Sequence, residues 1–455
     1  MNGAVHAQGF LTPPPNGSLP LVDQALDGSG APESNMKSLT QIQPGQVIPS
    51  KDPNLPALNG SLASYTISAP GNYYLTENLV GGKPIIITSD DVTLDLSGFE
   101  MRFPGGAPAT AISVAPGPGG APERVHVRNG FIVGGWDAGA VLPDYSSVRD
   151  LNVSGVNTFC ISVGAQSTVH NCIVHGQPLE GAEGPLPHAG IFGGVGAVIS
   201  HSTAREIHGV GIEVDRTGRV VDCTSNCNLG RGIVGADGAS LEGCTSFMNN
   251  EAGIAVGAGS SVVNTTSHEN LAEGFYLLPG TVVAHCASRL NEGQGYLAEG
   301  EVPGEPRGEE AIGFPFSANG SSFQHCSATR NQLSGFQTTI NSTFVHCTAD
   351  HNGTADGSAG SGFDVIDSCR IVNCMASNNL RHGIEGLEDN YIEQNTCHTN
   401  AMDGINLFST ANIVIKNYLK FNGGAPTTPA PGAGGIAPIV LPSAAAPNPF
   451  GNFVF

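Results

Sequence analysis

The stretch FVHCTADHN, residues 344–352, is ordinary by itself, but close copies of it recur along this chain of 455 residues. Each copy places a cysteine five residues before an asparagine. The other copies are VVDCTSNCN, LEGCTSFMN, VAHCASRLN, FQHCSATRN and IVNCMASNN. A fixed period of about 20–50 residues is typical of an architecture of stacked repeats.

The asparagines set the period of the repeat. Neighbouring members are 21 residues apart within each uninterrupted run. A glycine followed by an apolar residue comes three to five residues after most of them, as in GIAV, GFYL and GFDV. The asparagines are Asn228, Asn249, Asn270, Asn291, Asn331, Asn352, Asn379 and Asn400, and the cysteines are Cys223, Cys244, Cys286, Cys326, Cys347 and Cys374.

Each repeat is predicted to contain short strands, because Val, Ile, Thr and Phe alternate with polar residues between Gly, Asn and Ser. No stretch shows helical periodicity over two turns, and the regular leucine spacing of leucine-rich repeats is missing. The sequence therefore predicts an all-β, single-domain parallel β-helix, in which one repeat is one coil and equivalent residues stack about 4.8 Å apart.

The stack assigns structural roles to both recurring residues. Asparagine tolerates the left-handed backbone of a tight turn and can bond its neighbours along the stack. The cysteines are expected to be free thiols that point inward as small hydrophobic groups. Cys160, Cys227, Cys369 and Cys397 lie outside this column.

Composition shifts divide the chain into three parts. Residues 1–60 are rich in Pro, Gly and Ser and are expected to form an extended arm, residues 61–422 the β-helix, and residues 423–455 a second arm. The segment AVHAQ near the start looks like the tail of a secretory signal, which favours a secreted or periplasmic protein. The terminal PFGNFVF could dock on the helix or on another subunit, so the arms could join a homo-oligomer such as a trimer.

The charge balance excludes some partners. The chain has 18 Lys and Arg against 39 Asp and Glu, for a net charge of -21. Nucleic acid is a poor partner, because phosphate binding needs a basic surface. No apolar run approaches the roughly 20 residues of a membrane span.

The coil pattern N-x-x-x-G-I/F-x-V resembles the right-handed parallel β-helix proteins of the pectate lyase, alginate lyase and mannuronan C5-epimerase type, over roughly residues 65–422. SGFDVID (361–367) resembles the Gly-Phe-Asp start of the epimerase catalytic strand, and LRHGIEG (380–386) resembles an Arg-His-Gly coil of those enzymes. Val365, Ile366 and Asp367 stand where that motif has Pro-His-Glu, so only Asp364 carries over by position. The resemblance implies the fold and a carbohydrate-active protein.

Three insertions, at 176–190, 298–322 and 353–362, flank the strands that begin with Gly-Ile or Gly-Phe, whose outer surface we call the GI face. Loops that wall one face of a solenoid commonly carry the binding site. Asp364 and Glu385 are predicted to occupy the same outward position on successive coils, and Asp367 and Glu388 form a second such pair. Carboxylates in register repel unless a proton or cation intervenes. The pairs therefore suggest acid/base chemistry on a glycosidic bond, a Ca²⁺ site, or simply a solvated acidic face.

Further polar residues surround these pairs in the predicted arrangement. Arg381 and His382 could neutralise a uronate carboxylate and supply a proton donor, or could be ordinary turn residues. His285, His325 and His346 form a column beside the cysteines, but other polar residues fill the same position elsewhere. A second candidate set, for substrate binding, consists of Glu213, Asp215, Arg216, Arg231, Tyr276 and Glu299.

These observations favour an exported enzyme that processes a polysaccharide in a groove on the GI face, most of all a uronate polysaccharide lyase. With only five lysines, a neutral glycan and a hydrolase or transferase with a carboxylate pair remain an alternative. The other alternative is a glycan-binding or structural surface protein that breaks no bond.

Overall fold

The computed structural model describes residues 46–48, 64–104, 109–117, 120–176, 189–298, 320–354, 360–409, 411–424, 427–428, 439–440 and 451–454. All of them belong to one compact unit, Gln46–Phe455. Most of both arms, and residues 177–188, 299–319 and 355–359 of the insertions, lie outside the described residues.

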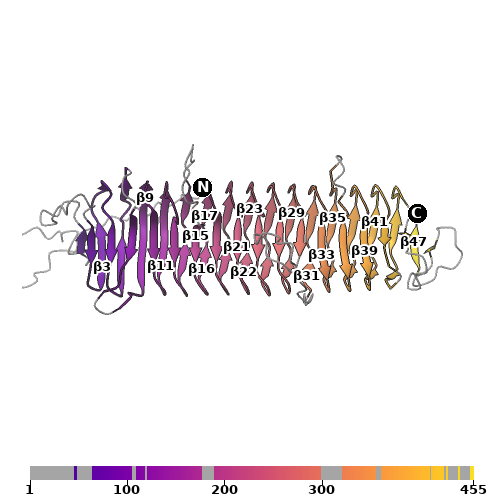
Figure 1. Cartoon of the computed structure of the whole chain (residues 1–455), viewed down its shortest axis with the longest axis horizontal. Coiled ribbons are helices and arrows are strands. Elements are labelled where there is room, and N and C mark those ends of the chain that lie inside the picture. Colours follow the sequence, from indigo (N-terminus) through magenta and orange to yellow (C-terminus); the bar gives the residue numbers. More distant parts are fainter. Residues whose placement is uncertain are drawn as a thin grey trace, which may run out of the picture. The chain divides into compact units, whose positions relative to one another are not determined.

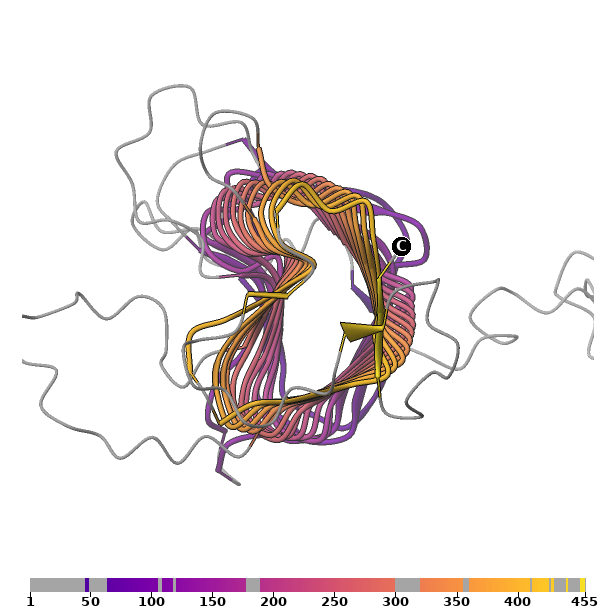
Figure 2. The same ribbon diagram turned by 90° about the vertical axis from the view of Figure 1, so that its right-hand side faces the viewer.

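The described residues form a parallel β-helix, which confirms the predicted fold (Figure 1). Seen from its end, the helix shows successive coils lying over one another (Figure 2). A typical coil contributes one strand to a 16-stranded sheet, which we call the GI sheet, and two strands to a 31-stranded sheet. The GI sheet consists of β2 (Tyr65–Ile67), β5 (Ile85–Ile87), β8 (Thr110–Val114), β10 (Ala138–Leu142), β12 (Ile161–Val163), β15 (Ala189–Gly193), β18 (Val210–Val214), β21 (Ile233–Gly235), β24 (Ile254–Val256), β27 (Phe275–Leu277), β30 (Tyr296–Ala298), β33 (Phe336–Ile340), β36 (Phe363–Asp367), β39 (Ile384–Glu388), β42 (Ile405–Leu407) and β45 (Thr427–Thr428).

The larger sheet is made of two parallel ladders that lie side by side. They merge at β9 (Val125–Gly134) and β11 (Ser147–Ser154), which run through both. The other strands of the first ladder are β1 (Gln46–Ile48), β3 (Gly71–Leu75), β6 (Val92–Asp95), β13 (Thr168–His170), β16 (Val198–Ser200), β19 (Arg219–Val221), β22 (Ser240–Glu242), β25 (Ser261–Val263), β28 (Val282–Ala284), β31 (Ser322–Gln324), β34 (Thr343–Val345), β37 (Arg370–Val372), β40 (Tyr391–Glu393) and β43 (Ile413–Ile415). Those of the second ladder are β4 (Leu79–Val80), β7 (Glu100–Phe103), β14 (Ile173–His175), β17 (Thr203–Arg205), β20 (Thr224–Asn226), β23 (Thr245–Phe247), β26 (Thr266–His268), β29 (Ala287–Arg289), β32 (Ser327–Thr329), β35 (Thr348–Asp350), β38 (Met375–Ser377), β41 (Thr396–His398), β44 (Tyr418–Lys420), β46 (Ile439–Val440) and β47 (Asn452–Val454).

Single residues with left-handed backbone turn the chain at three bends of each regular coil. The first bend separates the two ladders, the second precedes the GI strand, and the third follows it. His285, His325 and His346 occupy the first bend, with φ of 54°, 52° and 55°. Their column is therefore a corner position of the coil, shared with Asp222 and Asn264.

The recurring asparagines do not themselves adopt the left-handed conformation, so that part of the sequence-based prediction is wrong. The residue before each one does, for example Met248 before Asn249. The asparagine that follows is fully buried and bonds along the stack, as predicted. Each side-chain amide donates to the amide oxygen of the next coil over 2.8–3.0 Å, from Asn228 to Asn422. The ladder continues from Asn291 to Asn331 across an insertion.

We expect Asn249→Ala to destabilise the helix much more than Asn250→Ala. Asn249 donates to Asn270 and Ser246 and accepts from both nitrogens of Asn228, whereas its exposed neighbour lies outside the ladder. A buried polar group left without its partner costs about 1–3 kcal/mol, and a surface change stays within about 0.5 kcal/mol. Urea unfolding followed by circular dichroism measures both. Equal losses in the two variants would contradict a structural role for the ladder.

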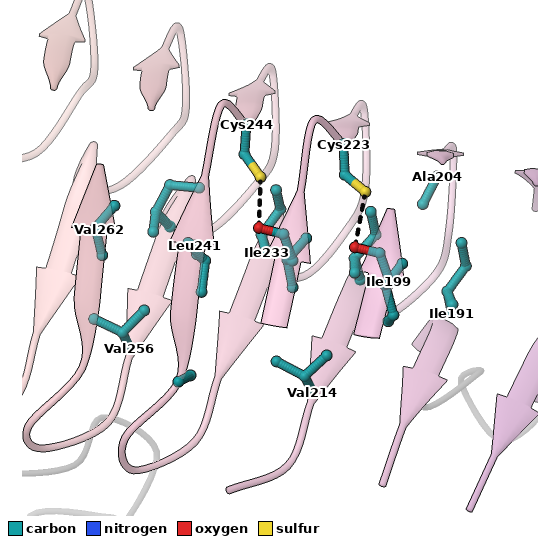
Figure 3. Close-up of a cluster of buried hydrophobic side chains, with 14 of the residues drawn as sticks. Ile191, Ile199, Ala204, Val214, Cys223, Ile233, Leu241, Cys244, Val256 and Val262 are labelled. Carbon is teal, nitrogen blue, oxygen red and sulfur yellow. Dashed lines mark hydrogen bonds between the residues drawn. The ribbon is translucent and has the colours of Figure 1, made fainter. Parts of the chain in front are cut away.

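The cysteines are free thiols, as predicted, and Cys227 alone among the 11 is half-buried rather than buried. Cys223 and Cys244 donate to backbone carbonyls of the preceding coil, those of Ile199 and Val220, over 3.6 and 3.5 Å (Figure 3). The Cys223 sulfur also accepts the backbone N–H of Ser202. A thiol thus serves this column as a small apolar group that still forms weak hydrogen bonds.

Burial raises the pKa of three of these thiols, to about 12 in Cys160 and Cys223 and about 11 in Cys244. Since the thiolate is the reactive form, we expect the native protein to react rapidly with an alkylating reagent at no more than one cysteine, Cys227. After unfolding, all 11 should react. Mass spectrometry of both samples counts the modified thiols. Rapid modification of several thiols in the native protein would show that the column is open to solvent.

Stacked aromatic rings fill the core behind four GI strands, β27, β30, β33 and β36, the last of which carries Asp364. The rings of Phe275, Tyr296, Phe336 and Phe363 stack with centroids 4.6, 4.7 and 4.9 Å apart. Phe344 packs edge-on against Phe363 at 5.6 Å. Because Phe363 directly precedes Asp364, this packing fixes the strand from which the carboxylate projects.

Segments from both predicted arms pair with the helix. β1 pairs with β3, and β47 pairs with β44. Asn452 in β47 is buried and accepts hydrogen bonds from the backbone and side chain of Asn417 over 3.1 and 3.0 Å. The end of the chain therefore adds a further step to a buried amide column.

Candidate functional site

The outward row of the GI sheet has the register predicted from the sequence. Asp364 pairs with Glu385 on the next coil, and Asp367 pairs with Glu388. Gln337 precedes this pair and Asn406 follows it. The full row is Glu213, Val234, Ala255, Tyr276, Leu297, Gln337, Asp364, Glu385 and Asn406.

Glu385 is a buried carboxylate whose two oxygens are both engaged. Arg381 Nη2 lies 2.9 Å from its Oε1, and the Ser361 hydroxyl donates to its Oε2 over 2.8 Å. The Glu385 side chain is 6% exposed and that of Arg381 is 39% exposed. These two contacts hold the Glu385 carboxylate in place, and removing either partner would leave it buried and under-compensated.

Asp364 is the less compensated member of the pair. Burial, and next the negative charge of Glu385, raise its pKa to about 6, although the nearby Arg381 acts in the opposite direction. No hydrogen bond to its carboxylate is found within the described part of the chain. A half-buried carboxyl that titrates near neutral pH is suited to give and take protons.

His382 lies behind the carboxylates and is buried. Its Nδ1 accepts the backbone N–H of Asp403 over 3.2 Å, and its Nε2 is 3.2 Å from the Asn406 amide. Nε2 faces the amide nitrogen of Asn406, and Nδ1 also lies 3.5 Å from Oδ2 of Asp403. Desolvation lowers the pKa of His382. Its place and protonation suit a positioning role.

Sequence reasoning missed Ser361, which belongs to a second row on this face. The row contains the residue before the glycine of each GI strand, including Gln294, Ser361, His382 and Asp403. Its side chains bond those of the outward row, as in Gln294 with Gln337, Ser361 with Glu385 and His382 with Asn406. The signal that would reveal them is a polar residue directly before Gly-Phe or Gly-Ile.

The glycine between the two rows is required by close packing. A Cβ on Gly383 would lie 2.5 Å from the carbonyl oxygen of Gly404 and 2.8 Å from the Asn400 amide nitrogen. The buried asparagine ladder and the polar row of the site therefore meet at this glycine.

The second acidic pair is more exposed. Glu388 is exposed, and Asp367 is half-buried and accepts a hydrogen bond from Ser368 over 2.8 Å. Three apolar side chains project next to the first pair, with exposures of 42% for Ile366, 41% for Leu387 and 54% for Phe408. Apolar surface of this kind, ending in an aromatic ring, can pack against the C–H faces of a sugar.

The structure does not bring the second predicted set together with Asp364. Glu213 lies six strands away in the GI sheet, or about 29 Å, and Tyr276 three strands away, or about 14 Å. Tyr276 is buried with Ala252, Ala255 and Leu297. The remaining members occupy turns or pair locally: Arg231 with Glu251 at 3.4 Å, and Asp215 with the backbone N–H of Arg216 at 2.7 Å. Glu299 lies outside the described residues.

The first acidic pair does not fit a Ca²⁺ site. Ca²⁺ takes six to eight oxygen ligands, whereas both oxygens of Glu385 are engaged by Arg381 and Ser361. The described part of the chain contains no group of three or more His, Cys, Asp or Glu side chains arranged to hold a metal ion.

A family model described as the right handed beta helix region matches residues 125–277. The match agrees with the observed fold, an all-β, right-handed parallel β-helix. No helix among the described residues is long and apolar enough to cross a membrane. No curated protein sequence matches the chain.

Solved structures with a similar fold include the A-module of a mannuronan C-5 epimerase from Azotobacter vinelandii. It is 14% identical, with 81% of this chain and 89% of that chain covered and a TM-score of 0.35. A periplasmic alginate epimerase is 11% identical over 79% and 76% of the two chains, with a TM-score of 0.37. A DFA-IIIase from Arthrobacter chlorophenolicus is 12% identical over 79% and 83%, with a TM-score of 0.34. Values this low establish neither activity nor substrate.

We expect Asp364→Asn to stabilise the protein at neutral pH. The folded-state pKa of about 6 exceeds the ordinary value of 3.8, so folding favours the protonated acid. The stability of the wild type therefore falls as pH rises between these values, and the loss is complete above pH 6. Above pH 6 the free energy of unfolding of the variant should exceed that of the wild type by about 1–3 kcal/mol.

Chemical unfolding across this pH range measures the difference, with Glu388→Gln as the control at an exposed carboxylate of the neighbouring strand. Below the ordinary pKa the stability gain of Asp364→Asn should disappear. A gain that is the same at every pH would show that the Asp364 carboxyl is not perturbed in the folded protein.

Proposed function

We propose that this protein is a polysaccharide-processing enzyme of the GI face, and that its reaction is β-elimination in a uronate polymer with Asp364 as the proton-transferring group. The observation that supports this most is the pKa of Asp364, raised to about 6 in the outward row beside the half-exposed guanidinium of Arg381. Elimination needs a base for the C5 proton and a cation for the adjacent carboxylate.

The electron and proton balance of the step is simple. Ionised Asp364 takes the C5 proton while Arg381 neutralises the uronate carboxylate, which stabilises negative charge developing at C5. The electron pair of the C5–H bond forms the C4–C5 double bond, and the C4–O bond breaks. Protonated Asp364 then returns its proton to the leaving oxygen. A group with a pKa near 6 can serve as base and acid in turn.

The remaining residues hold this pair in place. Ser361 and Arg381 fix Glu385, whose negative charge helps to raise the pKa of Asp364. His382 orients Asn406 at the next position of the row. Asp367 lies on the same strand as Asp364, three residues further on and nearer the exposed edge.

The substrate chain is expected to run across the coils. Ile366, Leu387 and Phe408 offer a row of exposed apolar surface beside Asp364 on which sugar rings can pack. Beyond the buried Tyr276, an extended polymer would reach towards Glu213, Asp215, Arg216 and Arg231, with Glu299 at the insertion. These residues are our candidates for binding along the chain of sugars.

A glycoside hydrolase is the second candidate, because two carboxylates in register on adjacent strands lie about 4.8 Å apart at the backbone. Retaining hydrolases place their carboxyl groups about 5–5.5 Å apart. Protonated Asp364 would be the acid and Glu385 the nucleophile. Lyase chemistry is favoured because both oxygens of Glu385 are already engaged.

The test is incubation with alginate, pectin, glucuronan, fructans and neutral glucans, read for the ultraviolet absorbance of an unsaturated product and for new reducing ends. We expect absorbance to rise with a uronate polymer. Asp364→Asn should lower the rate by about 100-fold or more, the usual size of an acid/base contribution. Arg381→Lys keeps a positive charge beside Glu385, so it should raise KM and leave the stability of the fold largely unchanged. Arg381→Ala removes that charge and should lower the stability as well.

Reducing ends without absorbance would contradict the lyase and favour the hydrolase, and no product from any polymer would favour a binding protein. The pH profile separates the two enzymes independently. For a lyase with Asp364 as base, kcat/KM rises with pH through about 6, because the ionised form is required. For a hydrolase with Asp364 as acid, it falls over the same range. We further expect the protein to be secreted or periplasmic, where such polymers occur.

A further inference from the structure

A groove on the first ladder, on a different face from Asp364, gathers basic side chains in a protein of net charge -21. It crosses β6, β9, β11 and β13. Three strand spacings of about 4.8 Å give it a length near 14 Å along the stack. Arg128, Arg149 and His170 line it, and hydroxyl and imidazole side chains lie beside them.

Three basic residues stand in register across this groove. Arg128 pairs in register with Arg149, and Arg149 with His170. Like charges directly opposite on neighbouring strands repel unless an anion lies between them. Asp95 compensates Arg128 at 2.9 Å. The exposed guanidinium of Arg149 has no ion pair or hydrogen bond among the described residues.

The neighbouring row supplies groups that bond sugar hydroxyls. Thr93, His126, Ser147 and Thr168 are consecutive in register. His126 Nδ1 lies 2.8 Å from the Ser147 hydroxyl, and His170 Nδ1 lies 3.0 Å from the Ser200 hydroxyl. Each ring is thereby oriented, and its second nitrogen is left to meet a ligand. Asp95 is paired with Arg128, and two acidic residues of the adjoining bend have partners of their own: Asp150 accepts from Asn171 over 2.7 Å, and Asp222 lies 3.6 Å from His201.

We infer that this groove is a second binding site for an acidic polysaccharide, with a sugar carboxylate held by Arg149 between Arg128 and His170. A guanidinium binds a carboxylate through two parallel N–H donors, and the hydroxyl row takes the sugar ring. The need for an anion rests on the groove itself, and the choice of a polysaccharide rests on the proposed function. The GI strand of this coil, β10, is nine strands or about 43 Å from β36. The groove therefore holds the polymer without touching the reacting bond.

The experiment uses the full-length chain with Asp364→Asn, so that little of the ligand is consumed. Hydrogen exchange is measured with and without a trisaccharide of galacturonate, with a neutral glucan trisaccharide and with inorganic sulfate. We expect the galacturonate trisaccharide to slow hydrogen exchange in Val125–His170. In Arg149→Ala the concentration of trisaccharide that gives half of this protection should rise about tenfold or more, as expected for the loss of a charged hydrogen bond. Arg289→Ala, an exposed arginine on β29 of the same sheet, is the matched control.

Equal loss of protection in Arg149→Ala and Arg289→Ala would overturn the inference, because it would report net charge alone. Equal protection by the neutral glucan would overturn it as well, and so would protection by sulfate without any by galacturonate. If the wild type processes none of the polymers but the groove is still protected, the proposed enzymatic function is contradicted and the groove site is supported. If protection is confined to the GI strands, the groove site is contradicted and the proposed function is supported.

Discussion

The hydrogen bond between stacked asparagine amides is the interaction on which the rest of this structure depends. It recurs from Asn228 to Asn422 at 2.8–3.0 Å and continues across insertions that change the length of a coil. Each asparagine oxygen also accepts a backbone N–H next to a left-handed bend, as Asn249 does from Asn228. In a parallel stack a slip of one residue would turn every side chain to the other face, so this column fixes what faces outward.

That register explains why much of the site could be predicted from the sequence. The 21-residue period places Asp364 beside Glu385 and Asp367 beside Glu388, and the structure has these pairs. The free cysteines followed from the same periodicity. Contacts between rows could not be predicted in this way, because alternation along one strand says nothing of the residue before the glycine. Ser361 was missed for that reason, and the contacts of the His382 ring are with Asp403 and Asn406 one coil further on.

The electrostatics of the GI face combine one satisfied and one unsatisfied carboxylate. Glu385 is bonded by a guanidinium and a hydroxyl. The ionised form of Asp364 is disfavoured by desolvation and by the negative charge of Glu385. A sequence under selection for stability alone would favour an amide at position 364. The rigid aromatic stack ending at Phe363 and the asparagine ladder tolerate this local cost. A half-buried carboxyl with such a perturbed pKa is a candidate for a reactive position.

The pairing of β47 with β44 bears on how these molecules behave at high concentration. A parallel β-helix exposes unpaired backbone N–H and C=O groups on its last coil, which is a template for adding strands from another molecule. Here the chain's own Asn452 extends the amide column of Asn417, so part of the growing edge is occupied in cis. The chain's own strands β47 and β46 therefore cover the backbone edge of β44, with which a strand from another molecule would otherwise compete to pair.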